Sequence, residues 1–85
     1  MEKQWVLYIL ECKDGTLYTG ITDDLDRRLA AHRAGKGAKY TRGRGPLTLR
    51  YVEKCEDRQH ALRREYAVKQ LTKLEKIALC QKNTI

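Results

Sequence analysis

Apolar and polar residues alternate along the N-terminal part of the chain, as they do in strands with one buried face. The pattern predicts one strand over about Gln4 to Cys12 and a second over about Thr16 to Thr22. The intervening Lys13-Asp14-Gly15 suits a three-residue hairpin loop, in which glycine closes a type I turn as a G1 bulge. A two-residue turn at Asp14-Gly15 is the alternative. The sequence therefore predicts an antiparallel hairpin whose register depends on the turn.

The turn decides where the two tyrosines of this hairpin lie. With the two-residue turn, Tyr8 and Tyr18 point to opposite faces, because side chains alternate along a strand. With the three-residue loop both tyrosines share one face, since a shift of one residue turns every side chain over. Leu10 then opposes Tyr18, and Gly20 opposes Tyr8 and leaves open space beside its phenol. We expect this second register, because Lys and Asp are favourable in the first two loop positions. The other face then carries a core stripe of Leu7, Ile9, Leu17 and Ile21.

Capping residues mark the ends of the next elements. Thr22-Asp23-Asp24 precedes a helix that we expect to reach about Arg33, where Gly35 closes it. A basic, glycine-rich loop follows over Gly35 to Pro46. A third strand is predicted over about Leu47 to Lys54, where apolar and polar residues alternate again.

Two helices are predicted to complete the fold. Glu56 or Asp57 caps a second long helix, and the capping box Thr72-x-x-Glu75 indicates a break followed by a short helix to about Gln81. The order β-β-α-β-α-α is typical of an α+β fold. We therefore expect a three-stranded antiparallel sheet flanked by helices, forming a single domain over residues 1–85.

Composition narrows the class of protein. The chain has no apolar run of the roughly 18 residues that a membrane helix needs. Its first residues lack a signal-peptide pattern, so we expect a cytoplasmic protein. The three cysteines are far apart and odd in number, which favours separate, half-buried thiols over a zinc site or a disulfide framework.

Positive charge is concentrated in one segment of the chain. The net charge is +7, and the segment from Arg27 to Val52 contains no acidic residue. Such a segment attracts polyanions. A solvated basic surface is the alternative, but glycines and an aromatic residue among the cations favour nucleic acid. The residues that we expect to contact nucleic acid are Lys36, Lys39, Tyr40, Arg42 and Arg44 within this segment, and Lys69 outside it.

Charged residues on the predicted helices lie on faces that should be buried. In the first helix Leu25 and Leu29 define the buried direction, and Arg28 and His32 lie within about 60° of it, whereas Arg27 points away. The alternative for Arg28 is a stem that covers the rim of the core while its head reaches water.

In the second helix Glu65 lies near the middle of an apolar stripe, and glutamate is rarely buried unless paired. Its partner is either Lys69 one turn on, Arg28 across the domain, or a metal ion. The stripe consists of Ala61, Leu62, Val68 and Thr72.

In their order and spacing these residues resemble the GIY-YIG nuclease superfamily, in particular small stand-alone bacterial proteins. Val6-Leu7-Tyr8 stands where the family has Gly-Ile-Tyr, and Tyr18-Thr19-Gly20 where it has Tyr-Ile-Gly. The resemblance extends to the segments Asp24-Leu25-x-x-Arg28-Leu29-x-x-His32, Ala61-Leu62-x-x-Glu65, Gly37-Ala38-Lys39-Tyr40-Thr41 and Lys69-Gln70-Leu71-Thr72.

The resemblance implies a metal-dependent endonuclease that hydrolyses nucleic-acid phosphodiester bonds in DNA repair or processing. By this resemblance Glu65 holds one Mg²⁺ or Mn²⁺ ion, and Arg28 neutralises charge on the phosphate. Tyr8 is expected to be the general base, with Tyr18 orienting the water or phosphate and His32 assisting by a hydrogen bond. A phenol is a weak base near neutral pH, so nearby positive charge is expected to lower its pKa.

Three departures from the family pattern keep an alternative open. Val6 replaces the first glycine, Ile21 stands where several relatives carry a lysine, and the stretch Lys76-Ile77-Ala78 offers no asparagine. The alternative is a catalytically weak or inactive nucleic-acid-binding module. A protein-interaction adaptor is a third, weaker hypothesis. For the nuclease we expect structure-directed or low sequence specificity, DNA in preference to RNA, and a possible protein partner that supplies specificity.

Overall fold

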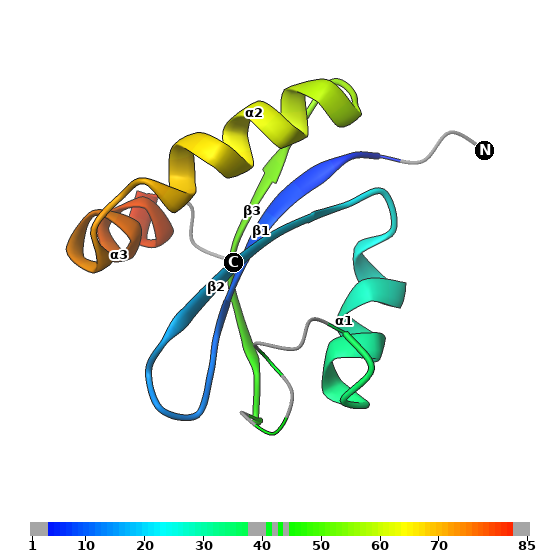
Figure 1. Cartoon of the computed structure of the whole chain (residues 1–85), viewed down its shortest axis with the longest axis vertical. Coiled ribbons are helices and arrows are strands. Elements are labelled where there is room, and N and C mark those ends of the chain that lie inside the picture. Colours follow the sequence, from blue (N-terminus) through cyan, green and yellow to red (C-terminus); the bar gives the residue numbers. More distant parts are fainter. Residues whose placement is uncertain (1–3, 38–40, 42, 44, 83–85) are drawn as a thin grey trace.

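The computed structural model describes residues 4–37, 41, 43 and 45–82. Within them the chain forms the predicted order of strands and helices, with a three-stranded antiparallel sheet (Figure 1). The elements are β1 (Val6–Glu11), β2 (Leu17–Thr22), α1 (Leu25–Arg33), β3 (Thr48–Lys54), α2 (Arg58–Lys69) and α3 (Lys73–Lys82). The strands are shorter than predicted by one or two residues at several ends, because the pattern does not locate the last ladder hydrogen bond.

The strand order β2-β1-β3 places β1 in the centre of the sheet and leaves β2 at an edge. The hairpin has the predicted three-residue loop. Gly15 has φ +84°, its N–H donates to the Cys12 carbonyl over 2.9 Å, and the Cys12 N–H donates to the Thr16 carbonyl over 2.8 Å. Tyr8 therefore pairs with Gly20, as expected, and Leu10 pairs with Tyr18.

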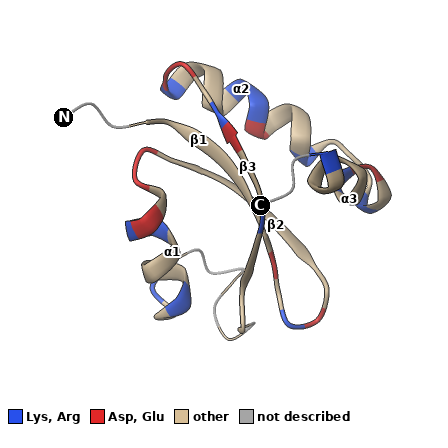
Figure 2. Ribbon diagram, turned by 180° about the vertical axis from the view of Figure 1, so that it is seen from behind, with Lys and Arg blue, Asp and Glu red and all other residues tan. Residues whose placement is uncertain are grey.

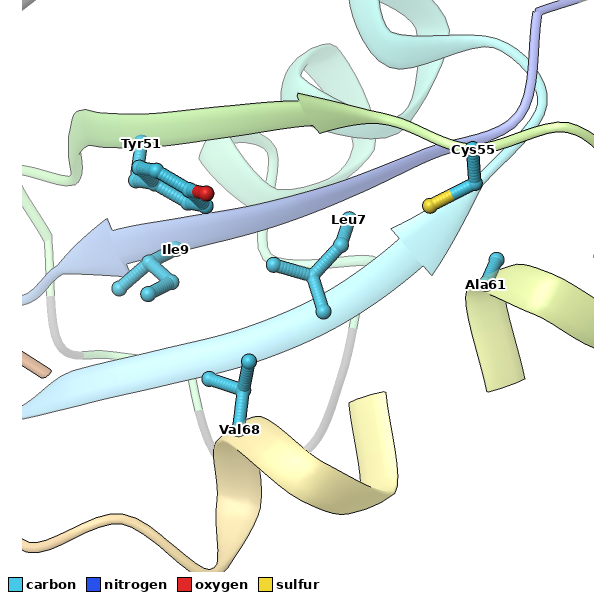
Figure 3. Close-up of a cluster of buried hydrophobic side chains, with 6 residues drawn as sticks. All are labelled: Leu7, Ile9, Tyr51, Cys55, Ala61 and Val68. Carbon is cyan, nitrogen blue, oxygen red and sulfur yellow. The ribbon is translucent and has the colours of Figure 1, made fainter. Parts of the chain in front are cut away.

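The helices cover opposite faces of the sheet, with α1 on one side and α2 and α3 on the other (Figure 1). The face under α2 carries the larger apolar cluster, and Figure 3 shows side chains of β1 and β3 meeting those of α2 there. Its buried members are Leu7, Ile9, Tyr51, Cys55, Ala61 and Val68, with Leu17 and Ile21 packed beside them. The predicted core stripe of the hairpin is thus confirmed.

The face under α1 carries the two tyrosines. Tyr8 and Leu10 are fully buried there, and Leu29 of α1 packs onto them while Tyr18 lies at the margin of the cluster. Cys12 and Cys55 are buried and Cys80 is half-buried, and all three are free thiols. None of the helices in the described part of the chain is long and apolar enough to span a membrane.

The predicted caps define the helix ends. Asp24 caps α1 by accepting from the Arg27 N–H, and Asp57, rather than Glu56, caps α2 by accepting from the His60 N–H over 2.8 Å. Thr72 and Glu75 form the predicted capping box of α3, with reciprocal hydrogen bonds of 2.9 and 3.2 Å.

An ion pair holds α2 against the sheet. Both oxygens of Glu53 on β3 accept hydrogen bonds from Arg64 of α2, over 2.5 and 2.9 Å, and Glu53 also accepts from the Tyr51 hydroxyl over 2.6 Å. Arg64 lowers the pKa of Glu53, and burial raises the pKa of Tyr51 to about 12. The orientation of α2, which carries Glu65, is thereby set by a side-chain network as well as by apolar packing.

Candidate active site

Tyr8 and Tyr18 share the face of the sheet that α1 covers, as the hairpin register predicts. Their ring centroids are 6.4 Å apart and the rings are tilted by 47°. Tyr8 is completely buried, whereas Tyr18 is partly exposed at the edge strand β2. The two phenols therefore form one cluster, of which only Tyr18 reaches solvent.

The expected open space beside Gly20 is filled by tyrosine. A Cβ atom at Gly20 would lie 2.5 Å from the Tyr8 hydroxyl oxygen and 3.1 Å from Cε2 of Tyr18. That expectation was wrong, because the phenol of Tyr8 lies across its strand partner instead of leaving the space vacant. Glycine is required here so that the rings can approach the backbone.

Arg28 reaches this cluster from α1, and Arg27 points to solvent, as the helical phase predicted. The Nε atom of Arg28 donates to the Tyr8 hydroxyl oxygen over 3.4 Å. The pKa of Arg28 is raised, first by its hydrogen bond to Tyr8 and less by charge interactions with both tyrosines. Arg28 is half-buried, so part of its surface remains accessible to an anion.

His32, one turn beyond Arg28, is buried and completes a chain of hydrogen bonds. Its Nε2 atom lies 2.9 Å from the Tyr8 hydroxyl, and its Nδ1 atom lies 2.8 Å from the hydroxyl of Thr41. Arg28 can only donate, so the Tyr8 oxygen accepts from it, and we assign the phenolic hydrogen to the bond with Nε2. Nε2 is then the acceptor, and we assign the hydrogen of the neutral imidazole to Nδ1, which donates to Thr41.

The loop after α1 holds the imidazole in place. The helix ends in a Schellman motif, in which Gly35 has φ +76° and the Lys36 N–H donates to the Ala31 carbonyl over 2.8 Å. Gly37 then packs against the ring of His32 so closely that a Cβ atom there would overlap Nδ1. Gly37 and Thr41 belong to a segment that resembles the family, but their contacts with His32 were not expected, because a loop has no periodicity from which a contact follows.

Burial controls the protonation of this cluster. It raises the pKa of Tyr8 above its ordinary value of 10.0, and the opposing effect of the Arg28 hydrogen bond is smaller. The expected lowering of this pKa was therefore wrong in sign. Burial also lowers the pKa of His32 below 6.5, and the charge of Arg28 lowers it further. Near neutral pH the pair consists of a neutral phenol and a neutral imidazole.

Glu65 lies on α2, on the other side of the sheet from α1. Its carboxylate is 3.3 Å from the ammonium of Lys69, and their side chains are 21% and 51% exposed, so the ion pair with Lys69, one of the three alternatives for Glu65, is present. Its charge is among the causes that raise the pKa of Tyr8. Of the stripe expected around it, Ala61 and Val68 are buried, but Leu62 is 39% exposed and Thr72 lies beyond the end of α2.

The carboxylate of Glu65 is the group at this place that could bind a divalent ion. Within the described residues no group of three or more His, Cys, Asp or Glu side chains is arranged to hold a metal. Mg²⁺ is commonly bound through one or two carboxylates, while waters and substrate phosphates complete its octahedron. The carboxylate of Glu65 fits an ion of that kind, which the substrate helps to bind, and does not fit a closed protein site.

The expected nucleic-acid contacts are described only in part. Lys36 is exposed after the end of α1, and Lys69 is exposed at the end of α2. Lys39, Tyr40, Arg42 and Arg44 lie outside the described residues. Asp26 stands in the first turn of α1 and Arg33 in its last turn, and Figure 2 shows red at the start of the helix and blue at its end.

Comparison with known proteins identifies the family of this chain. Residues 4–78 match the GIY-YIG catalytic domain. A UPF0213 protein of Halobacterium salinarum is 56% identical over 86% of this chain and 95% of its own length. A UPF0213 protein of Oceanobacillus iheyensis is 49% identical over 95% of this chain and 94% of its own.

Two solution NMR structures have a similar fold. The UPF0213 protein BH0048 of Bacillus halodurans has a TM-score of 0.62 at 48% identity, covering 95% of this chain and 86% of that one. The protein EF2693 of E. faecalis has a TM-score of 0.66 at 40% identity, covering 96% of this chain and 90% of that one. The chain therefore belongs to the GIY-YIG family, and its relatives include small UPF0213 proteins.

Proposed function

We propose that this protein is a metal-dependent endonuclease that hydrolyses phosphodiester bonds of nucleic acid, in DNA repair or processing. The observation that carries the proposal is the position of the Tyr8 hydroxyl between Arg28 Nε, at 3.4 Å, and His32 Nε2, at 2.9 Å. A cation that can bind phosphate and a base that can take a proton thus meet at one phenol. A protein that only binds nucleic acid would need the cation of Arg28 but not the imidazole of His32 beside the Tyr8 hydroxyl.

Arg28 is proposed to bind the scissile phosphate. Its guanidinium carries a permanent charge and several N–H donors beyond the one used by Tyr8. Charge on the non-bridging oxygens grows as water attacks phosphorus, and a donor already fixed in place stabilises that charge more than it stabilises the substrate. The hydrogen bond to Tyr8 supplies this fixation.

Tyr8 and His32 are proposed to act together on the attacking water. As the water oxygen forms its bond to phosphorus, its proton moves to the Tyr8 oxygen and the phenolic hydrogen moves to Nε2 of His32. The imidazolium that results keeps its Nδ1 hydrogen bond to Thr41. The phosphorus–oxygen bond to the leaving group breaks, and the leaving oxygen takes its proton from solvent. Because the Tyr8 side chain is fully buried, substrate binding must open a path for the water.

Tyr18 is proposed to orient the phosphate or the water. It is the exposed member of the tyrosine pair, and its ring lies edge-on to that of His32 at a centroid distance of 5.4 Å. Glu65 would hold the divalent ion, Mg²⁺ or Mn²⁺, which supplies Lewis-acid stabilisation of the departing oxygen when bound. For Glu65 to take this role its ion pair with Lys69 must open.

The proposed contacts are with phosphates, which position a nucleic acid without reading its sequence. We therefore propose low or structure-directed specificity, with DNA as the favoured substrate and a protein partner as a possible source of further selectivity. Lys36 and Lys69, with the basic loop residues Lys39, Tyr40, Arg42 and Arg44, are the proposed binding residues.

A catalytically weak or inactive binding module is the second candidate. The observation that favours it is the pairing of Glu65 with Lys69, which already satisfies the carboxylate. Titrating a labelled DNA with the protein, with Mg²⁺ and with EDTA, and resolving the products on a gel separates the two. The nuclease gives cleaved product only with the metal. Binding that is equal in both buffers, with no product from any DNA or RNA, would instead support the module.

A further inference from the structure

A groove runs along the edge strand β2 on the side that α2 and α3 cover. Two adjoining hollows form it, with volumes of about 330 and 200 Å³, and both are lined by Leu17 and Lys76. The first is completed by Tyr18, Thr19 and Lys69, and the second by Thr16 and Lys73. We call these residues together the β2–α3 groove.

The lining of the β2–α3 groove is cationic. Its three lysines come from the end of α2 and from α3, and Figure 2 shows basic positions along α3. Lys69 is paired with Glu65, whereas Lys73 and Lys76 form no ion pair within the described part of the chain. No acidic residue lines either hollow. The groove therefore presents uncompensated positive charge to whatever enters it.

The two uncompensated lysines lie along a single path. They are three residues apart on α3, so their side chains project from the same face of the helix. The ammonium of Lys73 lies beside the hairpin turn, 3.9 Å from where a Cβ atom of Gly15 would be. Lys76 lines both hollows. The positive charge thus extends from the turn toward the tyrosines.

The groove is continuous with the candidate active site through Tyr18. This partly exposed residue lines the first hollow and also packs beside Tyr8 and His32. An exposed aromatic ring beside cations is suited to stacking on a nucleic-acid base. In the wall of the same hollow, the hydroxyl of Thr19 is buried and has no hydrogen-bond partner among the described residues. Buried hydroxyls normally have one, so this wall is suited to a polar occupant.

We propose that the β2–α3 groove holds the nucleic-acid strand adjoining the scissile phosphate, with Lys73 and Lys76 each neutralising a backbone phosphate. This inference rests on the proposed function, because it takes the tyrosine cluster as the place of cleavage. An acidic peptide would also be attracted by the lysines. A nucleic-acid strand is favoured over an acidic peptide because the groove leads to Arg28, which is suited to bind a phosphate, and to Tyr18, which is suited to stack on a base.

The test is the salt dependence of binding in EDTA, so that it does not depend on turnover. A labelled single-stranded oligonucleotide is titrated at several salt concentrations, and the slope of log affinity against log salt is compared between proteins. Each phosphate contact to a single strand contributes about 0.7 to this slope. The double variant Lys73→Gln/Lys76→Gln should therefore have a slope smaller in magnitude by about 1.4, and Lys73→Arg/Lys76→Arg should keep it.

A matched control removes two charges elsewhere. Lys54 at the end of β3 and Arg58 at the start of α2 are exposed, and Arg58 is about 16 Å from Lys69 along the helix axis. Lys54→Gln/Arg58→Gln should leave the slope near that of the wild type. An equal change in both double variants, or none in the groove variant, would overturn the proposal even if the protein cleaves DNA. An equal loss of affinity for poly-glutamate would also overturn it.

The result of the salt-dependence experiment can be distinguished from the result of a cleavage assay, which tests the proposed function. If the groove variant alone loses slope while the wild type cleaves no nucleic acid with Mg²⁺ or Mn²⁺, the nuclease proposal fails and the groove is still supported as a nucleic-acid site. Far-UV circular dichroism of each variant shows whether the fold is kept. The substituted side chains lie on the surface of helices or at a strand end, so we expect no change.

Discussion

The hydroxyl of Tyr8 lies 2.9 Å from Nε2 of His32, and neither side chain is more than 2% exposed. Arg28 donates to the same hydroxyl from the solvent side of the cluster. The phenol can therefore pass its hydrogen to the imidazole at the moment when it accepts another. In the proposed mechanism, this arrangement allows Tyr8 to accept a proton although its own pKa is raised.

The pH dependence of cleavage should follow His32. The proposed path needs a neutral imidazole, which is present above its pKa and lost as pH falls through it. Because this pKa is lowered, kcat/KM should hold down to about pH 6.5 and decline only below that. At pH values above this decline kcat/KM should be independent of pH, since Tyr8 stays protonated. A rate that instead rises tenfold per pH unit between about pH 7 and 9 would indicate a tyrosinate base.

Thr41→Val should impair both stability and catalysis. It removes the partner of the His32 Nδ1–H and leaves a buried donor unsatisfied, which costs about 1–3 kcal/mol. Urea denaturation measures the loss, and single-turnover cleavage measures the effect on rate. Thr41→Ser keeps the oxygen and should restore most of both. A valine variant as stable and as active as the serine variant would refute the role of Thr41.

Arg28→Lys should lower kcat/KM by about 100-fold or more, because an ammonium cannot bond Tyr8 and a phosphate in the same geometry. The neighbouring Arg27 is exposed, so Arg27→Lys is the matched control and should cleave as the wild type does. Equal rates for the two variants would contradict the assignment of Arg28 to the site.

Gly20→Ala should disturb the tyrosine pair. The new methyl group would lie 2.5 Å from the Tyr8 oxygen and 2.7 Å from its Cζ, so the ring must move. Overpacking of this kind costs about 1–3 kcal/mol, and the hydrogen bonds of Tyr8 should weaken with it. Gly45→Ala, where a Cβ atom meets nothing within 4 Å, is the control. Unchanged thermal stability of Gly20→Ala would show that the rings do not occupy this space.

Much of the site could be predicted because strand and helix periods fix which side chains share a face. The loop Lys13-Asp14-Gly15 gave the register of Tyr8 and Tyr18, and the helical period separated Arg28 from Arg27. These are relationships between neighbours within regular elements. They need no knowledge of how deeply a group is buried.

What could not be predicted depends on packing. The contact of Thr41 with His32 spans an irregular loop, and no pattern indicates it. The sign of the Tyr8 pKa shift depends on the balance between burial and one hydrogen bond, which the order of residues does not contain. The expectation of open space at Gly20 was wrong for the same reason, because the position of the Tyr8 ring depends on packing.

Glu65→Gln tests the metal role with little effect on the fold. The ion pair that it breaks lies one helical turn apart with a half-exposed partner, so the loss of stability should be about 0.3–0.5 kcal/mol. The isosteric amide keeps the shape of the side chain but binds a divalent ion weakly. Thermal unfolding of the variant should therefore nearly match that of the wild type.

The most direct test of the nuclease proposal is a cleavage panel with wild type and Glu65→Gln at equal concentration. The panel contains single-stranded, double-stranded and branched DNA and RNA, each incubated with Mg²⁺, with Mn²⁺ and with EDTA. We predict that the wild type cleaves at least one DNA in a metal-dependent way, and that the variant binds the same DNA without cleaving it. Intact substrates throughout the panel, or cleavage by both proteins at the same rate, would contradict the proposal.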